Sequence, residues 1–202
     1  GIQYLAKGEQ RLMPAADLKI KGRHNLANAL ASLAIGDAAG FALPPMLEAL
    51  RRFEGLPHRC QWVREWKGVN FYNDSKGTNV GAAVAAVVGL GASGAGKVVL
   101  IAGGDGKGAD FAALKAPVLE YCSAVVLLGR DADRIEQALA SSAAEAPPLL
   151  RAESLQEAVQ MAAAQALSGD LVLLSPACAS FDMFDNFEAR GEVFMQAVRA
   201  LS

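Results

Sequence analysis

The order of apolar segments in the second half of the chain constrains its fold more than any other feature. Three short runs, 98–102, 124–128 and 171–174, contain only aliphatic residues, and segments with helical features separate them. A strand that is apolar on both sides must be covered on both faces, so such runs are typical of parallel strands inside a sheet. The order therefore predicts an α/β fold, with a mostly parallel sheet and helices on both faces.

Helices are expected after each of these runs. One begins near Phe111, one near Asp131, and a third spans 154–165. In the third helix, Ser154 and Glu157 have the spacing of a capping box, in which each side chain bonds a backbone N–H near the other residue. A closing helix carries three apolar residues at helical spacing, Phe187, Phe194 and Val198.

A two-stranded hairpin is expected just before this alternating region. Strict alternation places Trp62, Arg64 and Trp66 on one face of its first strand. Residues 67–68 form the turn, and 69–72 return as the second strand.

Residues 1–56 follow a different plan and are expected to form a separate region. Short apolar runs within 1–21 fit two short strands. A helix is expected over 25–40, because three leucines recur on one face: Leu26, Leu30 and Leu33. A second helix runs over 44–53, and the Gly-Leu-Pro sequence at 55–57 then places a domain boundary before 57–202.

Composition argues against several classes of function. The formal net charge of −2 and the lack of a long Lys or Arg run do not fit a nucleic-acid-binding surface. Three widely spaced cysteines form no CxxC pair, which favours a reducing, cytoplasmic compartment over a disulfide framework. Two histidines are too few for a Cys/His metal cage, so no metal site is expected. The most apolar segment, 81–96, is too short to cross a bilayer.

One glycine-rich segment, 91–98, nearly matches the P-loop pattern GxxxxGK[ST] but fails its structural requirements. A working P-loop follows a strand and opens a helix, whereas here the strand comes after the glycines. Val98 also stands where a Ser or Thr is needed to bind magnesium. We therefore interpret 91–98 as a connection between a helix and a strand.

The loops after the apolar strands are the candidate sites, because ligands of parallel sheets bind at the carboxyl ends of the strands. The loop 73–79 places carboxylate, ammonium and hydroxyl groups in one turn, which suits a nucleotide together with an anionic substrate, although such residues are also common helix caps. In the loop 103–110, Lys107 can present a cation to a carboxylate or phosphate, and a solvated turn lysine is the open alternative.

Two further segments carry polar groups of interest. In the loop 175–186, Ser180 can offer its hydroxyl beside backbone N–H groups that bind a carboxylate, while Cys178 has no neighbouring histidine and is interpreted as a small apolar filler. Asn25 and Asn28 lie three residues apart at a helix start, where their amides share a face and suit a base or a ribose. A polar cap on an amphipathic helix is the alternative for this pair.

Taken together, five motifs of this chain resemble those of the Mur ligases. In chain order they are GRHNLANALA (22–31), LPHR (56–59), NDSKGTN (73–79), GGDGKGADF (103–111) and SPACASFDMFDNFEARG (175–191). The resemblance extends over the whole chain, and the last two motifs resemble the branch of the family that adds D-glutamate. It implies that 1–56 is the end of a central ATP-binding domain and that 57–202 is a complete, Rossmann-like C-terminal domain. The start without Met fits this expectation of a section of a longer protein.

The resemblance also implies roles for individual residues. Family positions that contact ATP match Asn25, Asn28, Arg59, Asp74 and Lys76. Positions that hold the carboxylates of D-glutamate match Thr78, Lys107, Ser180 and Phe187, and Phe181 borders that site. The true P-loop, the magnesium ligands and the UDP-substrate domain of the family have no counterpart here.

The activity implied by the resemblance is ATP-dependent ligation in peptidoglycan synthesis. ATP and Mg2+ would activate UDP-N-acetylmuramoyl-L-alanine as an acyl phosphate, which the amine of D-glutamate attacks. We expect the chain alone to be inactive. Three alternatives stay open: a sister ligase of the Mur or folylpolyglutamate synthase type, a non-catalytic domain that binds a small anion or a protein partner, and a dehydrogenase, whose dinucleotide fingerprint is incomplete here.

Overall fold

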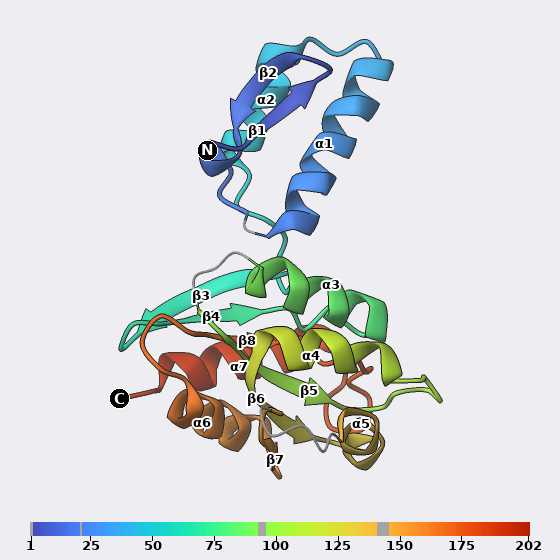
Figure 1. Ribbon diagram of the computed structural model, residues 1–202, viewed down its shortest axis with the longest axis vertical. Coiled ribbons are helices and arrows are strands. Elements are labelled where there is room, and N and C mark those ends of the chain that lie inside the picture. The colour runs from blue at the N-terminus through green and yellow to red at the C-terminus, as the bar shows by residue number, and fades with distance from the viewer. Residues whose placement is uncertain (1, 21, 93–95, 141–145) are drawn as a thin grey trace. The chain divides into compact units, whose positions relative to one another are not determined.

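The chain divides into two compact units, Gly1–Leu56 and Pro57–Ser202. The computed structural model describes residues 2–20, 22–92, 96–140 and 146–202 (Figure 1). The division falls at the same position as the Gly-Leu-Pro break in the sequence.

The first unit combines a short hairpin with two helices. Its elements are β1 (Tyr4–Lys7), β2 (Gln10–Pro14), a 3-10 turn (Ala15–Asp17), α1 (Arg23–Ala38) and α2 (Leu43–Arg52), and β1 pairs antiparallel with β2. Prolines near the start of α2 have no N–H to lose there, which is why a helix tolerates them in its first turn. The small core consists of Leu5, Met13, Leu18, Ala29 and Leu33.

Helix α1 is apolar on two sides, and only one of them packs inside this unit. Ala29 and Leu33 are buried, but Leu30, which the sequence placed on the same stripe, is 39% exposed. A second stripe at helical spacing is exposed and consists of Ala27, Leu30, Ala31, Ala34, Ile35 and Ala38. Helices that are apolar on more than one side are usually covered by further protein, so this stripe is a surface on which association is expected.

We expect the chain to self-associate through this stripe, and we expect Leu30→Gln together with Ile35→Gln to weaken that association. These are the two largest side chains of the stripe, and Ile35 is 70% exposed, so the change removes apolar surface without disturbing the core. Sedimentation velocity over a concentration series measures the effect. The control replaces Leu119 and Leu167, which are exposed on the second unit. A wild-type chain that stays monomeric throughout would contradict the prediction.

The second unit is built on one six-stranded sheet. In spatial order its strands are β3 (Gln61–Trp66), β4 (Val69–Asn73), β8 (Leu171–Leu174), β5 (Val98–Gly103), β6 (Cys122–Leu128) and β7 (Leu149–Arg151). Only the β3–β4 hairpin is antiparallel, so the predicted mostly parallel sheet is confirmed. The sequence did not indicate β7, because an edge strand of three residues is too short to show a pattern.

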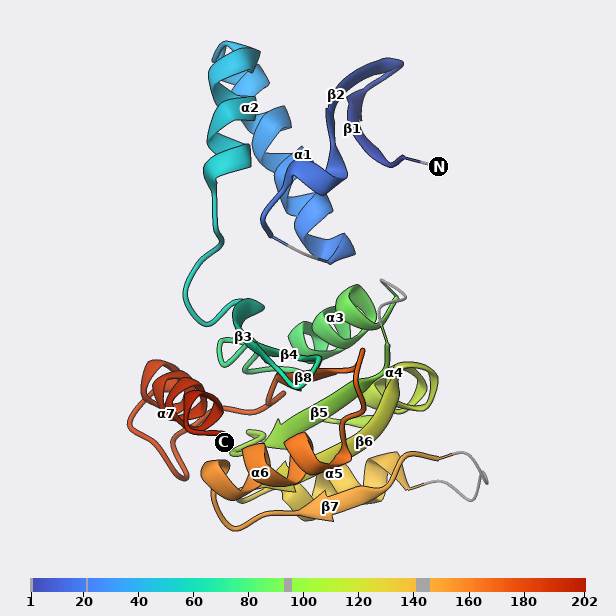
Figure 2. The same ribbon diagram turned by 90° about the vertical axis from the view of Figure 1, so that its left-hand side faces the viewer.

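Helices cover both faces of this sheet, as predicted (Figure 2). One face packs against α3 (Val80–Gly91), α4 (Lys115–Tyr121) and α5 (Ala132–Leu139). The other packs against α6 (Leu155–Gln165) and α7 (Phe187–Arg199). At the start of α6, Ser154 accepts from the Glu157 N–H at 3.2 Å, while Glu157 accepts from the Glu153 N–H, one residue earlier than a capping box requires.

The prediction that Trp62, Arg64 and Trp66 share one face of the first hairpin strand is wrong. Trp62 pairs with Tyr72, but Arg64 pairs with Phe71, so one residue of β3 is bulged between them. Because consecutive residues of β4 face opposite sides, Trp62 lies on the opposite face from Arg64 and Trp66. Strict alternation cannot reveal a bulge, since one inserted residue reverses the face of everything before it.

The segment that resembles a P-loop joins the end of α3 to the start of β5, an order opposite to that of a working P-loop. Residues 93–95 of this segment lie outside the described residues. Across the described part of the chain, no helix is long and apolar enough to span a membrane.

Candidate functional site

Three polar loops meet where the adjacent strands β4, β8 and β5 end. We call them the β4 loop (73–79), the β8 loop (175–186) and the β5 loop (103–110). The Ala177 N–H donates to the Gly77 carbonyl at 2.9 Å, which joins the β8 and β4 loops. Asp105 and Ala179 exchange two backbone hydrogen bonds of 3.0 and 2.8 Å, which join the β5 and β8 loops. Parallel topology and these bonds hold the polar residues of all three loops at one edge of the sheet.

Glycines permit this close approach of the loops. Gly104 has a φ of 127°, and a Cβ there would lie 2.3 Å from the Ala179 carbonyl oxygen. A Cβ at Gly77 would lie 2.5 Å from an oxygen of Asp74. Both positions therefore require a residue without a side chain.

Asp74 is the buried carboxylate of the β4 loop. It accepts from the Ser175 hydroxyl at 2.7 Å and from the Cys60 N–H at 3.1 Å. Burial raises the pKa of the Asp74 carboxyl to about 6, although these hydrogen bonds and the charge of Arg59 act in the opposite direction. The field of Arg59 at Asp74 shows that the two candidates lie near each other, and the Arg59 side chain is exposed.

Lys76 and Phe187 form a second group. The Lys76 ammonium lies 3.8 Å from the centroid of the Phe187 ring, within range of a cation–π interaction. The Ser75 hydroxyl donates to the Phe187 carbonyl at 2.8 Å, which joins the β4 loop to the start of α7. His58 packs edge-on against Phe187, and its carbonyl accepts from the Lys76 N–H at 3.0 Å.

Lys107 stands at the tip of the β5 loop. Its φ of 51° is left-handed, and its N–H donates to Asp105 Oδ1 at 3.0 Å. Asp105 also accepts from Arg130 at 3.1 Å, so this carboxylate fixes the loop from both sides. The Lys107 side chain is exposed, with its ammonium 5.9 Å from the ring of Phe181, which is 68% exposed.

Ser180 is the buried hydroxyl of the β8 loop. It is 2% exposed, and its Oγ finds no hydrogen-bond partner within the described residues. A buried hydroxyl left unpaired costs about 1–3 kcal/mol, so Ser180 is a candidate ligand contact. Ser123 Oγ and Asp182 Oδ1 are also buried and without a partner among the described residues. Thr78 of the β4 loop is half-buried, and its N–H donates to the Lys76 carbonyl at 2.8 Å.

The two asparagine candidates belong to the first unit. Asn28 donates to Asn25 through its amide at 3.4 Å, so the pair shares a face at the start of α1, as its spacing indicates. Their relation to the candidates of the second unit stays a prediction.

Three residues of the site were not given a role by sequence reasoning. Arg190 of α7 is 3% exposed and bonds both the β4 and β8 loops. Asp105 fixes Lys107, and buried His58 contacts the Asn73 amide at 2.9 Å. The sequence pattern could have identified Arg190, because it lies on the apolar stripe of the closing helix. An arginine buried there must be fully hydrogen-bonded.

Cys178 is fully buried, and burial raises the pKa of its thiol to about 12. The thiol therefore stays protonated at neutral pH, which agrees with its interpretation as an apolar filler. Within the described residues, no three His, Cys, Asp or Glu side chains are grouped to hold a metal ion.

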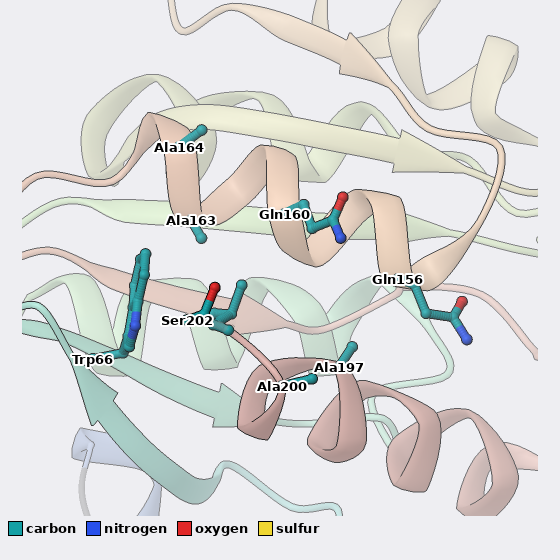
Figure 3. A pocket seen from close by; sticks show the side chains of 9 residues that line it. Trp66, Gln156, Gln160, Ala163, Ala164, Ala197, Ala200 and Ser202 are labelled. Atoms are coloured by element: carbon teal, nitrogen blue, oxygen red, sulfur yellow. The ribbon is translucent and has the colours of Figure 1, made fainter.

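One hollow of the second unit lies away from the bridged loops, and another includes part of the β5 loop. One groove of about 410 Å³ lies between α6 and α7 beside Trp66 (Figure 3). Four of its nine lining residues are alanines and two are glutamines, Gln156 and Gln160, so its lining offers no cationic side chain to an anion. Another, of about 420 Å³, is lined by the end of the β5 loop, 108–110, together with Phe111 and Arg134. The charges and the unpaired hydroxyl lie on the bridged loops, which we therefore retain as the site.

The fold defines an α/β domain whose polar loops lie at the carboxyl ends of its parallel strands, where domains of this class bind their ligands. Solved structures share this fold. A UDP-N-acetylmuramate-alanine ligase from Thermotoga maritima matches with a TM-score of 0.64 at 22% identity, covering 91% of this chain and 39% of that one. A Mycobacterium tuberculosis folylpolyglutamate synthase, solved with ADP, matches with a TM-score of 0.62 at 14% identity, covering 92% and 42%.

The sequence is more specific than the fold. Residues 58–178 match the family described as Mur ligase, glutamate ligase domain, and the chain therefore belongs to the Mur ligase family. The chain is 62% identical over its whole length to the UDP-N-acetylmuramoylalanine--D-glutamate ligase of Pseudomonas putida, of which it covers 44%. Identity to the ligases of the same name from Pseudomonas aeruginosa and Nitrosococcus oceani is 58% and 57%. The chain thus spans less than half the length of these relatives.

We predict that Asp74→Asn stabilises the second unit at neutral pH and that this gain shrinks toward pH 4. The Asp74 pKa is near 6 when folded and near 3.8 when unfolded, so ionisation costs more in the folded state. The carboxyl's contribution to stability is therefore complete below about pH 4 and is lost as the pH rises to about 6. Asn avoids this loss, which is on the order of 3 kcal/mol.

Urea unfolding at several pH values, followed by tryptophan fluorescence, tests this prediction. Both tryptophans, Trp62 and Trp66, lie in the second unit, so the emission reports that unit alone. The control is Asp185→Asn, an exposed aspartate of the β8 loop. A stability difference that does not change with pH would show that ionisation of Asp74 is not its cause.

Proposed function

We propose that this chain is the amino-acid-binding and nucleotide-contacting part of an ATP-dependent ligase that joins D-glutamate to UDP-N-acetylmuramoyl-L-alanine in peptidoglycan synthesis. The observation that carries the proposal is the buried, unpaired Ser180 hydroxyl on a loop bridged directly to the loop of Lys107. The 57–62% identity to ligases named for D-glutamate supports the choice of amino acid.

The amino-acid site takes its groups from all three loops and from the start of α7. D-glutamate has two carboxylates, and Lys107 supplies a cation for one of them. The Ser180 hydroxyl and Thr78 supply hydrogen bonds, and Phe187 closes the site beside Lys76. Phe181 borders it near Lys107. Since the loops are joined by backbone bonds, these groups are held in place before the ligand arrives, which lowers the entropic cost of binding.

The proposed nucleotide contacts come from Arg59 and from two residues of the β4 loop, Asp74 and Lys76. Arg59 and Lys76 are cations suited to the phosphates of ATP, and the Asp74 carboxylate suits a ribose hydroxyl. Asn25 and Asn28 would add amide contacts from residues 1–56, which we assign to the end of the central ATP-binding domain. Residues 57–202 are then the C-terminal domain. Mg2+ would be held mainly by the rest of the full-length protein, as the resemblance to the Mur ligases implies.

In this proposal the residues of the chain bind and orient rather than break bonds. ATP supplies the phosphoryl group that activates the carboxylate of UDP-N-acetylmuramoyl-L-alanine. Lys107 and Ser180 fix the carboxylates of D-glutamate, so its amine points at the activated carbonyl, and positioning of this kind supplies much of the rate. A cytoplasmic location follows from the use of ATP and stays part of the proposal. The only support for the sister-ligase alternative is that such ligases share this fold. No observation favours the dehydrogenase or the non-catalytic domain.

We expect D-glutamate, but not L-glutamate, to shift the NMR signals of Thr78, Lys107, Ser180 and Phe187 in the labelled chain. Lys107→Ala should weaken binding at least about tenfold, because a carboxylate loses its charged partner. Lys67→Ala is a matched control, since its lysine also has a left-handed φ, 52°, and also lies over an aromatic ring, that of Trp66. Equal shifts with both isomers, or equal loss in both variants, would contradict the assignment.

The chain alone should release no phosphate when given ATP, D-glutamate and UDP-N-acetylmuramoyl-L-alanine. Its one near-match to a P-loop has the wrong element order and lacks the Ser or Thr that binds magnesium. A phosphate-release assay against an enzyme-free blank measures this. Release that depends on D-glutamate would show that the chain holds a complete catalytic site.

A further inference from the structure

Arg190 is a buried arginine that binds two of the loops at once. Its side chain extends from the first turn of α7. Nε donates to the Ser75 hydroxyl at 3.0 Å, one terminal nitrogen donates to the Ser75 carbonyl at 2.8 Å, and the other donates to the Cys178 carbonyl at 3.1 Å. Ser75 belongs to the β4 loop and Cys178 to the β8 loop, so one planar group joins both.

The position would otherwise suit an apolar residue. Arg190 lies on the buried stripe of α7 with Phe194 and Val198, and a buried charge is costly unless it is fully hydrogen-bonded. Burial lowers the pKa of the guanidinium to about 10, so it remains charged at neutral pH. Within the described residues it makes no ion pair, and its hydrogen bonds go to neutral atoms of the loops. Fixing the loops is therefore the evident use of this charge.

The two bonded residues flank the proposed ligand contacts. Ser75 lies between Asp74 and Lys76. Its hydroxyl accepts from Arg190 and donates to the Phe187 carbonyl, so it links Arg190 to Phe187. Cys178 lies two residues before Ser180. The guanidinium thus connects the proposed nucleotide contacts of the β4 loop to the proposed D-glutamate contact of the β8 loop.

We propose that Arg190 is a positioning residue that keeps the β4 and β8 loops in the register on which binding of the amino acid depends. The proposal rests on the function proposed above for where D-glutamate binds. The effect of Arg190 on the loops in the absence of ligand is independent of that proposed function. Arg190 does not touch the ligand, and its fork of N–H groups, rather than its charge alone, performs the role.

Arg190→Lys tests this distinction, because lysine keeps the charge and loses the planar fork. The first measurement is amide hydrogen exchange without ligand. The Ala177 and Ala179 amides, which bond the neighbouring loops, should exchange at least about tenfold faster in the variant. Val126 and Val172, in the centre of the sheet, should keep their rates. Unchanged exchange at the two loop amides, or an equal increase at all four, would overturn the proposal.

The second measurement is the dissociation constant for D-glutamate, which should rise at least about tenfold in Arg190→Lys. Arg64→Lys is the matched control, since Arg64 also donates to a backbone carbonyl of α7, that of Arg199, on the outside of the domain. Tight binding retained in Arg190→Lys would overturn the positioning role. A wild-type chain that binds no D-glutamate would instead refute the proposed amino-acid site, and amide exchange would still decide the effect of Arg190 on the loops.

Ser75→Ala provides a second route if Arg190→Lys does not fold. It removes the hydroxyl that links Arg190 to Phe187 and keeps the guanidinium bonds to the two carbonyls. The expected effects on exchange and on binding have the same direction and are smaller. Wild-type exchange and wild-type affinity in this variant would count against the proposal.

Discussion

The parallel alignment of β4, β8 and β5 is the constraint on which the rest of the second unit depends. Parallel strands end at the same edge of a sheet, so three loops that are far apart in sequence begin within reach of one another. Backbone bonds between Gly77 and Ala177, and between Asp105 and Ala179, then fix the loops directly. The backbone therefore sets the positions of the loops, and the polar side chains project from loops that are already held together.

Close approach of three loops buries polar groups, and most of them satisfy one another. The Asp74 carboxylate takes the Ser175 hydroxyl and the Cys60 N–H, while the Ser75 hydroxyl bonds both Arg190 and Phe187. Among the described residues of these loops, the Ser180 hydroxyl and one oxygen of Asp182, Oδ1, are buried without a partner. An unpaired hydroxyl among satisfied neighbours is informative, because the same loops show that partners were available to polar groups that needed them.

Much of the fold could be predicted from the sequence, and the failures have physical causes. The strands β5, β6 and β8 were found because a strand buried on both faces must be wholly apolar. The face of Trp62 was missed because a bulge leaves no mark in an alternating pattern, and β7 because it is too short. Lys107 and Ser180 were singled out because strand-end loops carry ligands, and their roles stay predictions. The contacts of Arg190 were not, because they go to backbone atoms and to a serine 115 residues away.

Asp74 and Arg190 are opposite charges buried in one small region, yet they do not form an ion pair. Each is held by neutral hydroxyl, amide and carbonyl groups, and the charge of Asp74 acts to raise the pKa of Arg190 without a direct contact. A direct pair would satisfy both charges and leave the loops free to move. With the charges apart, any shift of the β4 loop leaves a buried charge without a partner, which is strongly unfavourable in a low-dielectric interior. Both charges therefore depend on the loops for their hydrogen-bond partners, so they favour the same loop arrangement that the backbone bonds set.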